Sequence, residues 1–214
     1  MKVTHNKLFP IIMSVYTPDY KITQQEKDFL KNLEVRKLKP ESGVSTSTCV
    51  DIFNTYPELK NIRNVMLDVA EQYKRDVFGI SNELAPVHSW IAKQNKGNYH
   101  HKHIHPNVLF NLVYYIEGSE NAPLKILLGS GKSRLTESFN LAFNVVHNNG
   151  FNSGAYRHYC KDGEIVCIPG WLKHGTDTSI GDRMCIGWNF FVKGVLGECP
   201  FEVINLSTSL DNDK

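Results

Sequence analysis

The sequence predicts a mainly β protein, an antiparallel sandwich or jelly roll with helices gathered at its N-terminal end. Two segments with helical periodicity precede residue 84, and after it come short β-branched and aromatic runs separated by Gly, Asn and Asp. No helical pattern interrupts these later runs. The strands that they predict therefore pair with one another as antiparallel sheets, and the helices cover one face.

Length and composition are those of one globular domain. A chain of 214 residues can bury a full core but is too short for two large domains. We expect a helical N-terminal buttress over residues 1–83, a jelly-roll core over 84–206 and a frayed tail over 207–214. The net charge of +2 is small, so nucleic acid is not an expected partner.

The cysteines and the apolar runs favour a soluble protein of a reducing cytoplasm. Five cysteines are odd in number and form no C-x-x-C motif, so neither a disulfide framework nor a zinc ribbon is indicated. The first apolar run is too short for a signal peptide. Nowhere are there 18 consecutive apolar residues, so no membrane span is expected.

The first elements are predicted by local signals. Leu8–Tyr16 is apolar and partly β-branched, and Pro10 near its start favours an edge strand. Thr23 and Glu26 have the spacing of a capping box. The apolar residues that follow recur at helical spacing, so a first helix is predicted near Gln24–Glu34.

A second, longer helix is predicted over Pro57–Val77. Thr55 and Glu58 form a second capping-box pattern, and Pro57 stands where a missing N–H costs nothing. Lys39–Asp51 before it is rich in Ser and Thr and is expected to be a loop. The apolar stripe that predicts core packing consists of Ile62, Val65, Met66, Val69, Ala70 and Tyr73.

Eight short runs are predicted to form the strands of the jelly roll. They are Val87–Ala92, Val108–Ile116, Leu124–Leu128, Asn140–Val146, Glu164–Ile168, Leu172–Thr178, Met184–Val192 and Phe201–Asn205.

Four of the nine histidines lie within six residues of one another, just before the second of these runs. His103 and His105 are two apart, so in an extended strand both point to one face and can converge on a metal ion. His101 could pair with His103 by the same rule. The third ligand decides between the two registers, and a cluster of surface histidines without a metal is an equally ordinary reading.

A third histidine and an arginine follow at the far end of the chain. Glu164–Ile168 reads as a strand with a tight turn after it, and His174 then lies on the next short strand, where a jelly roll can bring it to the early histidines. Arg183 begins an alternating strand that puts it on one face with Cys185, Gly187 and Asn189. A buried arginine needs an anion, either an internal carboxylate or a bound one.

Three motifs together resemble a known family. In order and spacing, H-I-H-P-N-x-x-x-N-x-V-Y-Y-I, G-E-I-V-C-I-P-G-W-L-K-H and R-M-C-I-G-W-N-F are similar to the iron(II)/2-oxoglutarate-dependent oxygenases. The resemblance is to a small bacterial and phage branch and covers Trp90–Phe190. It implies a double-stranded β-helix core, cupin-like in form, buttressed by two or more helices.

The resemblance also implies a site and a reaction. The metal set would be His103, His105 and His174, and the set binding 2-oxoglutarate would be Arg183, Tyr115 and Asn189. With iron(II) and O2, such an enzyme hydroxylates a substrate, here an unidentified small molecule or protein side chain, and releases succinate and CO2. The implied location is the cytoplasm of a bacterial or phage-infected host cell.

The sequence departs from the wider family, and two other functions stay open. His105 stands where most members have Asp, so an acidic residue such as Asp177 is an alternative third ligand. Cys185 replaces a Ser, and Asn111 stands in place of another Ser. One alternative is a cupin-like three-histidine metalloenzyme without 2-oxoglutarate, in which Arg183 forms a structural ion pair. The other is a non-catalytic jelly-roll binding module.

Overall fold

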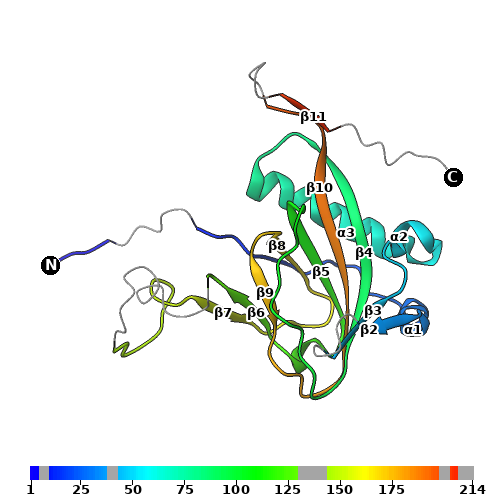
Figure 1. The fold of residues 1–214 in the computed structure, drawn as a ribbon, viewed down its shortest axis with the longest axis horizontal. Coiled ribbons are helices and arrows are strands. Elements are labelled where there is room, and N and C mark those ends of the chain that lie inside the picture. The colour runs from blue at the N-terminus through cyan, green and yellow to red at the C-terminus, as the bar shows by residue number, and fades with distance from the viewer. Residues whose placement is uncertain (5–9, 38–42, 130–143, 198–202, 207–214) are drawn as a thin grey trace.

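The fold consists of two facing antiparallel sheets with helices on the outer face of the larger one. The computed structural model describes residues 1–4, 10–37, 43–129, 144–197 and 203–206. The larger sheet has the order β1-β8-β5-β10-β4-β3-β2, with β11 paired to the far end of β10, and the smaller has the order β7-β6-β9. Figure 1 shows β5, β10 and β4 side by side and the β10–β11 ribbon projecting from the body.

The strands are β1 Ser14–Tyr16, β2 Val35–Lys37, β3 Val44–Ser47, β4 Glu83–Gln94, β5 Phe110–Glu117, β6 Leu124–Leu127, β7 Ala155–His158, β8 Ile165–Pro169, β9 Lys173–Thr176, β10 Arg183–Leu196 and β11 Ile204–Leu206. The helices are α1 Gln24–Asn32, α2 Ile52–Thr55 and α3 Lys60–Tyr73, with 3-10 turns at Pro57–Leu59 and Ser119–Asn121 and a π-helical end at Lys74–Phe78.

Alternation along β5 separates the two cores of the molecule. Leu112 and Tyr114 belong to the core between the large sheet and the helices. Tyr115 points the opposite way, into the core between the two sheets, where Leu124 of β6 also lies. Because successive side chains of a strand face opposite ways, one central strand supplies both cores.

The long helix α3 covers the outer face of the large sheet. Five residues of the predicted stripe are buried there, namely Ile62, Met66, Val69, Ala70 and Tyr73. Each large apolar side chain buried in this way stabilises the fold by roughly 1.5–3 kcal/mol. Pro57 occupies the first position of the 3-10 turn that leads into the helix. The helix predicted over Pro57–Val77 is confirmed.

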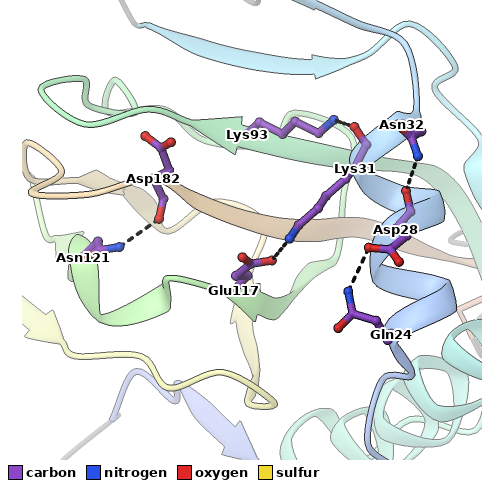
Figure 2. A network of polar contacts seen from close by, with 8 residues as sticks. All are labelled: Gln24, Asp28, Lys31, Asn32, Lys93, Glu117, Asn121 and Asp182. Carbon is purple, nitrogen blue, oxygen red and sulfur yellow. Dashed lines mark hydrogen bonds and ion pairs between the residues drawn. The ribbon is translucent and has the colours of Figure 1, made fainter.

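The first helix is capped as predicted and is tied to the large sheet. The Thr23 hydroxyl accepts from Glu26 N at 3.2 Å, and the Glu26 carboxylate accepts from Thr23 N at 2.8 Å. At the other end of the helix, Lys31 forms an ion pair of 2.7 Å with Glu117 at the end of β5, and Lys93 Nζ donates to Lys31 O (Figure 2). These contacts join α1 to the edge of the site described below.

A mainly β fold with N-terminal helices is confirmed, and most predicted strands are present with shifted ends. Three strands were not predicted: β2, β3 and β7. The loop predicted over Lys39–Asp51 is wrong in part, because β3 forms there by pairing Val44 with Gln94 of β4. That pairing partner is 50 residues away and leaves no local signal. The N-terminal 83 residues thus supply strands as well as helices.

Two further expectations differ from the structure. The second capping box is wrong: Thr55 Oγ1 donates to Asp51 O at 2.7 Å, and the turn at Pro57 begins without a side-chain cap. In the run 140–146, residues 140–143 lie outside the described residues and 144–146 form no strand. The tail expected at 207–214 also lies outside them. Among the helices that the structure describes, none has the length and apolar character needed to span a membrane.

Candidate metal centre

A cavity between the two sheets brings together residues from six strands, including Val44 of β3, and from the histidine-rich segment before β5. It is lined mainly by Trp90, Gln94, His100, His103, His105, Asn111, Tyr115, Leu124, His174, Thr176, Arg183, Cys185 and Gly187. Both sheets and the segment 97–109 therefore contribute to one site. The three histidines singled out in the sequence, and the arginine, all line this cavity.

The rings of His103, His105 and His174 converge on one point. One nitrogen from each lies within 4.8 Å of the other two. Nε2 of His105 and Nε2 of His174 are 3.3 Å apart, and the three ring-centroid distances are between 4.5 and 5.1 Å. Three nitrogens so close together match the geometry of a metal site, in which each ligand stands about 2 Å from the ion.

Backbone pairing sets this convergence. His103 and His174 form an isolated antiparallel bridge, with hydrogen bonds of 2.8 and 2.9 Å between their backbones. His105 N then donates to Gly170 O at 2.9 Å. The H-I-H segment is thus attached to β9 by a bridge and is not the regular strand that its alternation suggested. The same alternation still holds, since His103 and His105 face the cavity together.

The bridge also decides which pair of histidines faces the cavity, His101 with His103 or His103 with His105. His101 does not belong to the converging group. Its ring instead packs near the rings of His100 and His103, with centroids 5.3 and 5.1 Å away. The structure therefore brings together His103, His105 and His174, which is the register preferred in the sequence.

A metal ion binds an imidazole through a nitrogen lone pair, and hydrogen bonds and burial favour the uncharged ring that keeps one. Nδ1 of His103 and Nδ1 of His174 each lie 2.8 Å from a backbone carbonyl, which can only accept, so each Nδ1 carries the proton and Nε2 keeps its lone pair. Burial, reinforced by the neighbouring histidines, lowers the pKa of His105 to about 4 and that of His174 to about 3. Both rings are therefore neutral at neutral pH.

Arg183 is buried without a carboxylate. Its side chain is 7% exposed, and its guanidinium carbon lies 5.4 Å from the centre of the Tyr115 ring. It takes part in none of the ion pairs among the described residues. Burial raises the pKa of Tyr115 well above its ordinary value, so the phenol is neutral beside the cation. An unpaired buried cation is costly, so this end of the cavity is suited to an anion.

The residue before Arg183, Asp182, is held in place at the start of β10. Asp182 O accepts from Asn121 Nδ2 at 2.8 Å (Figure 2), and an Asp182 carboxylate oxygen accepts from Lys96 N at 2.9 Å. Gly118 lies so close to Asp182 O that a Cβ would come within 2.1 Å of it. The backbone that carries the arginine is thus held by two separate segments, the turn at residues 118–121 and the residue Lys96.

Asn189, expected to bind 2-oxoglutarate, and Asp177, the alternative metal ligand, have other partners in the structure. Asn189 accepts a hydrogen bond of 2.8 Å from Asn111 Nδ2 and is not among the residues that line the cavity. Asp177, the alternative third ligand, forms ion pairs with Arg157 and Lys125. Its carboxylate is committed there, and those two cations hold its pKa below the ordinary value in spite of burial.

Four lining residues were not singled out as site residues in the sequence: Trp90, Gln94, His100 and Thr176. Trp90 and Gln94 lie on one face of β4, four residues apart, so alternation along that strand was the available signal. His100 belongs to the histidine-rich segment but falls outside the i, i+2 pattern. Thr176 is two residues after His174 and shares its face by the same alternation.

The comparisons with known proteins agree with this geometry. Residues 88–189 match the model of a protein family described as "Putative 2OG-Fe(II) oxygenase". This match over 102 of the 214 residues supports the iron(II)/2-oxoglutarate-dependent oxygenase superfamily. The activity that it supports is that of an oxygenase that uses iron(II), 2-oxoglutarate and O2.

Solved structures of other oxygenases have the same fold. HygX from Streptomyces hygroscopicus with nickel and 2-oxoglutarate bound is 14% identical, with a TM-score of 0.58 over 84% of this chain and 82% of that one. A 2OG-Fe(II) oxygenase family protein from Burkholderia pseudomallei is 13% identical, with a TM-score of 0.56 over 83% of each chain. These likenesses establish the double-stranded β-helix fold of the oxygenase. No curated protein matches the chain.

In the oxygenase, Trp90 supports one histidine of the site. Its ring stacks on that of His105, with centroids 5.8 Å apart and planes inclined by 26°. Gly187, opposite Trp90 on β10, leaves room for the ring, since a Cβ there would lie 2.5 Å from Trp90 Cζ2. Packing around the metal centre thus depends on a residue without a side chain.

We expect Gly187→Ala to displace the Trp90 ring and with it His105. Overpacking of this kind costs about 1–3 kcal/mol of unfolding free energy. Urea unfolding and metal analysis of the purified variant measure the two effects. Gly150→Ala is the matched control, because nothing lies within 4 Å of the added Cβ there. Equal unfolding free energies and equal metal contents for both variants would contradict the expectation.

Proposed function

We propose that His103, His105 and His174 hold the iron(II) of the oxygenase and that Arg183, beside Tyr115, binds the distal carboxylate of 2-oxoglutarate. The observation that carries the proposal is the convergence of three imidazole nitrogens within 4.8 Å of one another, in a cavity that also holds a buried arginine. We further propose a cytoplasmic enzyme.

The donor set is suited to iron(II). Imidazole is an accepted ligand of this ion, and three protein ligands leave coordination positions for other molecules. The described residues offer no carboxylate within the converging group, so the ion would keep its full charge of two. A dianionic oxoacid offsets that charge when it binds.

The arginine end is suited to a dicarboxylate. Arg183 is the first residue of β10, and its side chain lines the cavity. It has no acidic partner among the described residues. A guanidinium can bind a carboxylate through two parallel hydrogen bonds. The structural ion pair that a cupin-like enzyme without 2-oxoglutarate would need at Arg183 therefore has no support in the described residues.

The proposed reaction is a hydroxylation. The substrate R–H, 2-oxoglutarate and O2 become R–OH, succinate and CO2, with one oxygen atom entering the alcohol and one entering succinate. Bound iron(II) supplies the redox chemistry and the coordination positions for the oxoacid and O2. The chain orients the oxoacid through Arg183 and keeps the rings of His105 and His174 neutral. His174 and Arg183 are 4% and 7% exposed, so both are largely removed from bulk water.

The substrate that we propose is a small molecule or a protein side chain. Ile104 and Trp171, next to the histidines and to the Gly170 turn, are 46% and 58% exposed. Exposed apolar side chains of this size beside a site are available for contact with a substrate. HygX, one of the similar structures, has been solved with hygromycin B bound, which is a small molecule.

The test is release of succinate from 2-oxoglutarate by the iron-loaded protein in air, without added substrate. Uncoupled turnover that depends on both iron(II) and 2-oxoglutarate supports the proposal. Protein that binds iron but neither binds nor consumes 2-oxoglutarate would favour a three-histidine metalloenzyme of the cupin kind. Protein whose metal can be removed without any loss beyond stability would favour a binding module.

A substitution at His105 tests the departure from the wider family. We expect His105→Asp to retain about one iron(II) per chain, because carboxylate and imidazole are both accepted ligands and the change restores a two-histidine, one-carboxylate set. His105→Ala should lose the metal. Metal analysis under anaerobic conditions measures both, and full occupancy with turnover in His105→Ala would exclude His105 as a ligand.

A further inference from the structure

His100 is a buried polar residue of the cavity to which the proposed function gives no role. Its ring lies beside that of His103, with centroids 4.5 Å apart, and it lines the same cavity. Its Nε2 is shielded from solvent and has no hydrogen-bond partner among the residues that the structure describes. A buried polar atom left without a partner destabilises a fold, so an apolar side chain would suit the protein alone better.

The position of His100 is fixed by its backbone. His100 N donates to Thr176 Oγ1 at 2.8 Å, and Thr176 N donates to His100 O at 3.1 Å. Thr176 Oγ1 in turn donates to Gln94 Oε1 at 3.3 Å. Gly175 allows the segment to approach β9 closely, because a Cβ there would lie 2.7 Å from His100 O. The imidazole is thus held in the cavity by β4 and β9 together.

His100 and Arg183 pack against different side chains of the cavity. The ring of His100 packs against that of His103, one of the proposed ligands. The guanidinium of Arg183 instead lies over the Tyr115 ring. A 2-oxo acid that binds the metal through its 2-oxo group and the adjacent 1-carboxylate would place that carboxylate beside the three proposed ligands. His100 packs against one of these ligands, His103.

We propose that His100 donates a hydrogen bond from Nε2 to the metal-side carboxylate of the 2-oxo acid, while Arg183 binds the distal carboxylate. This inference rests on the proposed function. A carboxylate only accepts hydrogen bonds, and a neutral imidazole has one N–H to give, so the two groups are complementary. Hydrogen bonds to an ionised acceptor are the stronger kind, which offsets the burial of the imidazole. His100 is therefore a positioning residue for the co-substrate.

The experiment measures binding without turnover. Protein loaded with Mn(II) in place of iron(II) is titrated in a calorimeter without O2, first with 2-oxoglutarate and then with 2-oxopentanoate. The second acid has a methyl group where the first has the distal carboxylate. The variants are His100→Leu, His100→Phe, His100→Gln and Arg183→Met, and the control is His88→Leu, at an exposed histidine of β4.

The two residues should respond differently to the two acids. His100→Leu and His100→Phe should weaken both acids about tenfold or more, which corresponds to about 1.4 kcal/mol. His100→Gln keeps an N–H and should recover part of the loss. Arg183→Met should weaken 2-oxoglutarate alone. The metal-free His100→Leu protein should melt at the wild-type temperature or above it, because the variant removes an unpaired buried group.

Three results would overturn the inference. Wild-type affinity for both acids in His100→Leu and His100→Phe would exclude the hydrogen bond. Weakening confined to 2-oxoglutarate would assign His100 to the distal carboxylate instead. Loss of Mn(II) from both variants would make His100 part of the metal site. Wild-type protein that binds Mn(II) but neither acid would contradict the proposed function itself, which separates that failure from these.

Discussion

Replacing His174 with alanine is expected to remove nearly all iron(II) from the protein and to abolish uncoupled succinate release. His174 supplies one of three converging nitrogens and is 4% exposed, so no other side chain can take its place without rearrangement. The loss of affinity should exceed the roughly 10–100-fold that is typical when only a partner of a metal ligand is removed. Metal analysis after anaerobic loading and desalting gives the occupancy, and His103→Ala should behave in the same way.

His101→Ala is the matched control for this prediction. It removes an imidazole from the same segment but from outside the converging group, so the variant should keep about one iron(II) per chain. If His101→Ala lost the metal and His105→Ala kept it, the ligands would follow the other alternation of the segment. Circular dichroism of each variant separates the loss of a ligand from the loss of the fold.

Replacing Arg183 with methionine is expected to weaken 2-oxoglutarate binding about ten- to a hundredfold or more while the iron content stays nearly unchanged. Hydrogen bonds to charged groups contribute roughly 1.5–3 kcal/mol, which corresponds to a factor of that size. Arg183→Lys should also weaken binding, since lysine offers a point charge in place of a two-pronged donor. Titration with 2-oxoglutarate, followed by succinate release, measures the change.

Arg157→Met controls for the loss of an arginine as such, because Arg157 pairs with Asp177 and is not among the cavity residues. Its 2-oxoglutarate constant should equal that of the wild type. An Arg183→Met protein that binds 2-oxoglutarate normally would contradict the anion site. A variant that loses its fold would instead indicate that Arg183 is needed for structure.

Local signals predicted the two longer helices, α1 and α3, and the main strands, but not the short helix α2. Distant pairing explains the strands that were missed. The first capping box succeeded because the partners of Thr23 and Glu26 are local: each side chain accepts from the other residue's backbone N–H, and Tyr20 donates to Glu26. The second capping box, at Thr55 and Glu58, did not form because the Thr55 hydroxyl donates to Asp51 O, which lies before the expected start of the helix. β3 and β7 form against β4 and β6, so their short polar sequences carry little sign of it.

The candidate site was predicted in outline from spacing and from the resemblance to the oxygenases. The alternation of His103 and His105 was a local property and held even outside a regular strand. That His174 and Arg183 line the same cavity depends on how the two sheets face each other, which only the ordered motifs suggested. His100 escaped notice because its place in the cavity is set by backbone contacts with Thr176, which the sequence does not reveal.

The anchoring of β10 has a consequence for which oxoacids the enzyme can accept. Arg183 is the first residue of a strand that is paired on both sides, and the carbonyl just before it is held by Asn121. His174 is fixed in turn by pairing with β6 and with His103. Under the proposed function, the separation between these two anchored residues would favour one chain length of dicarboxylate. We expect oxaloacetate, one methylene shorter, and 2-oxoadipate, one methylene longer, to bind more weakly than 2-oxoglutarate.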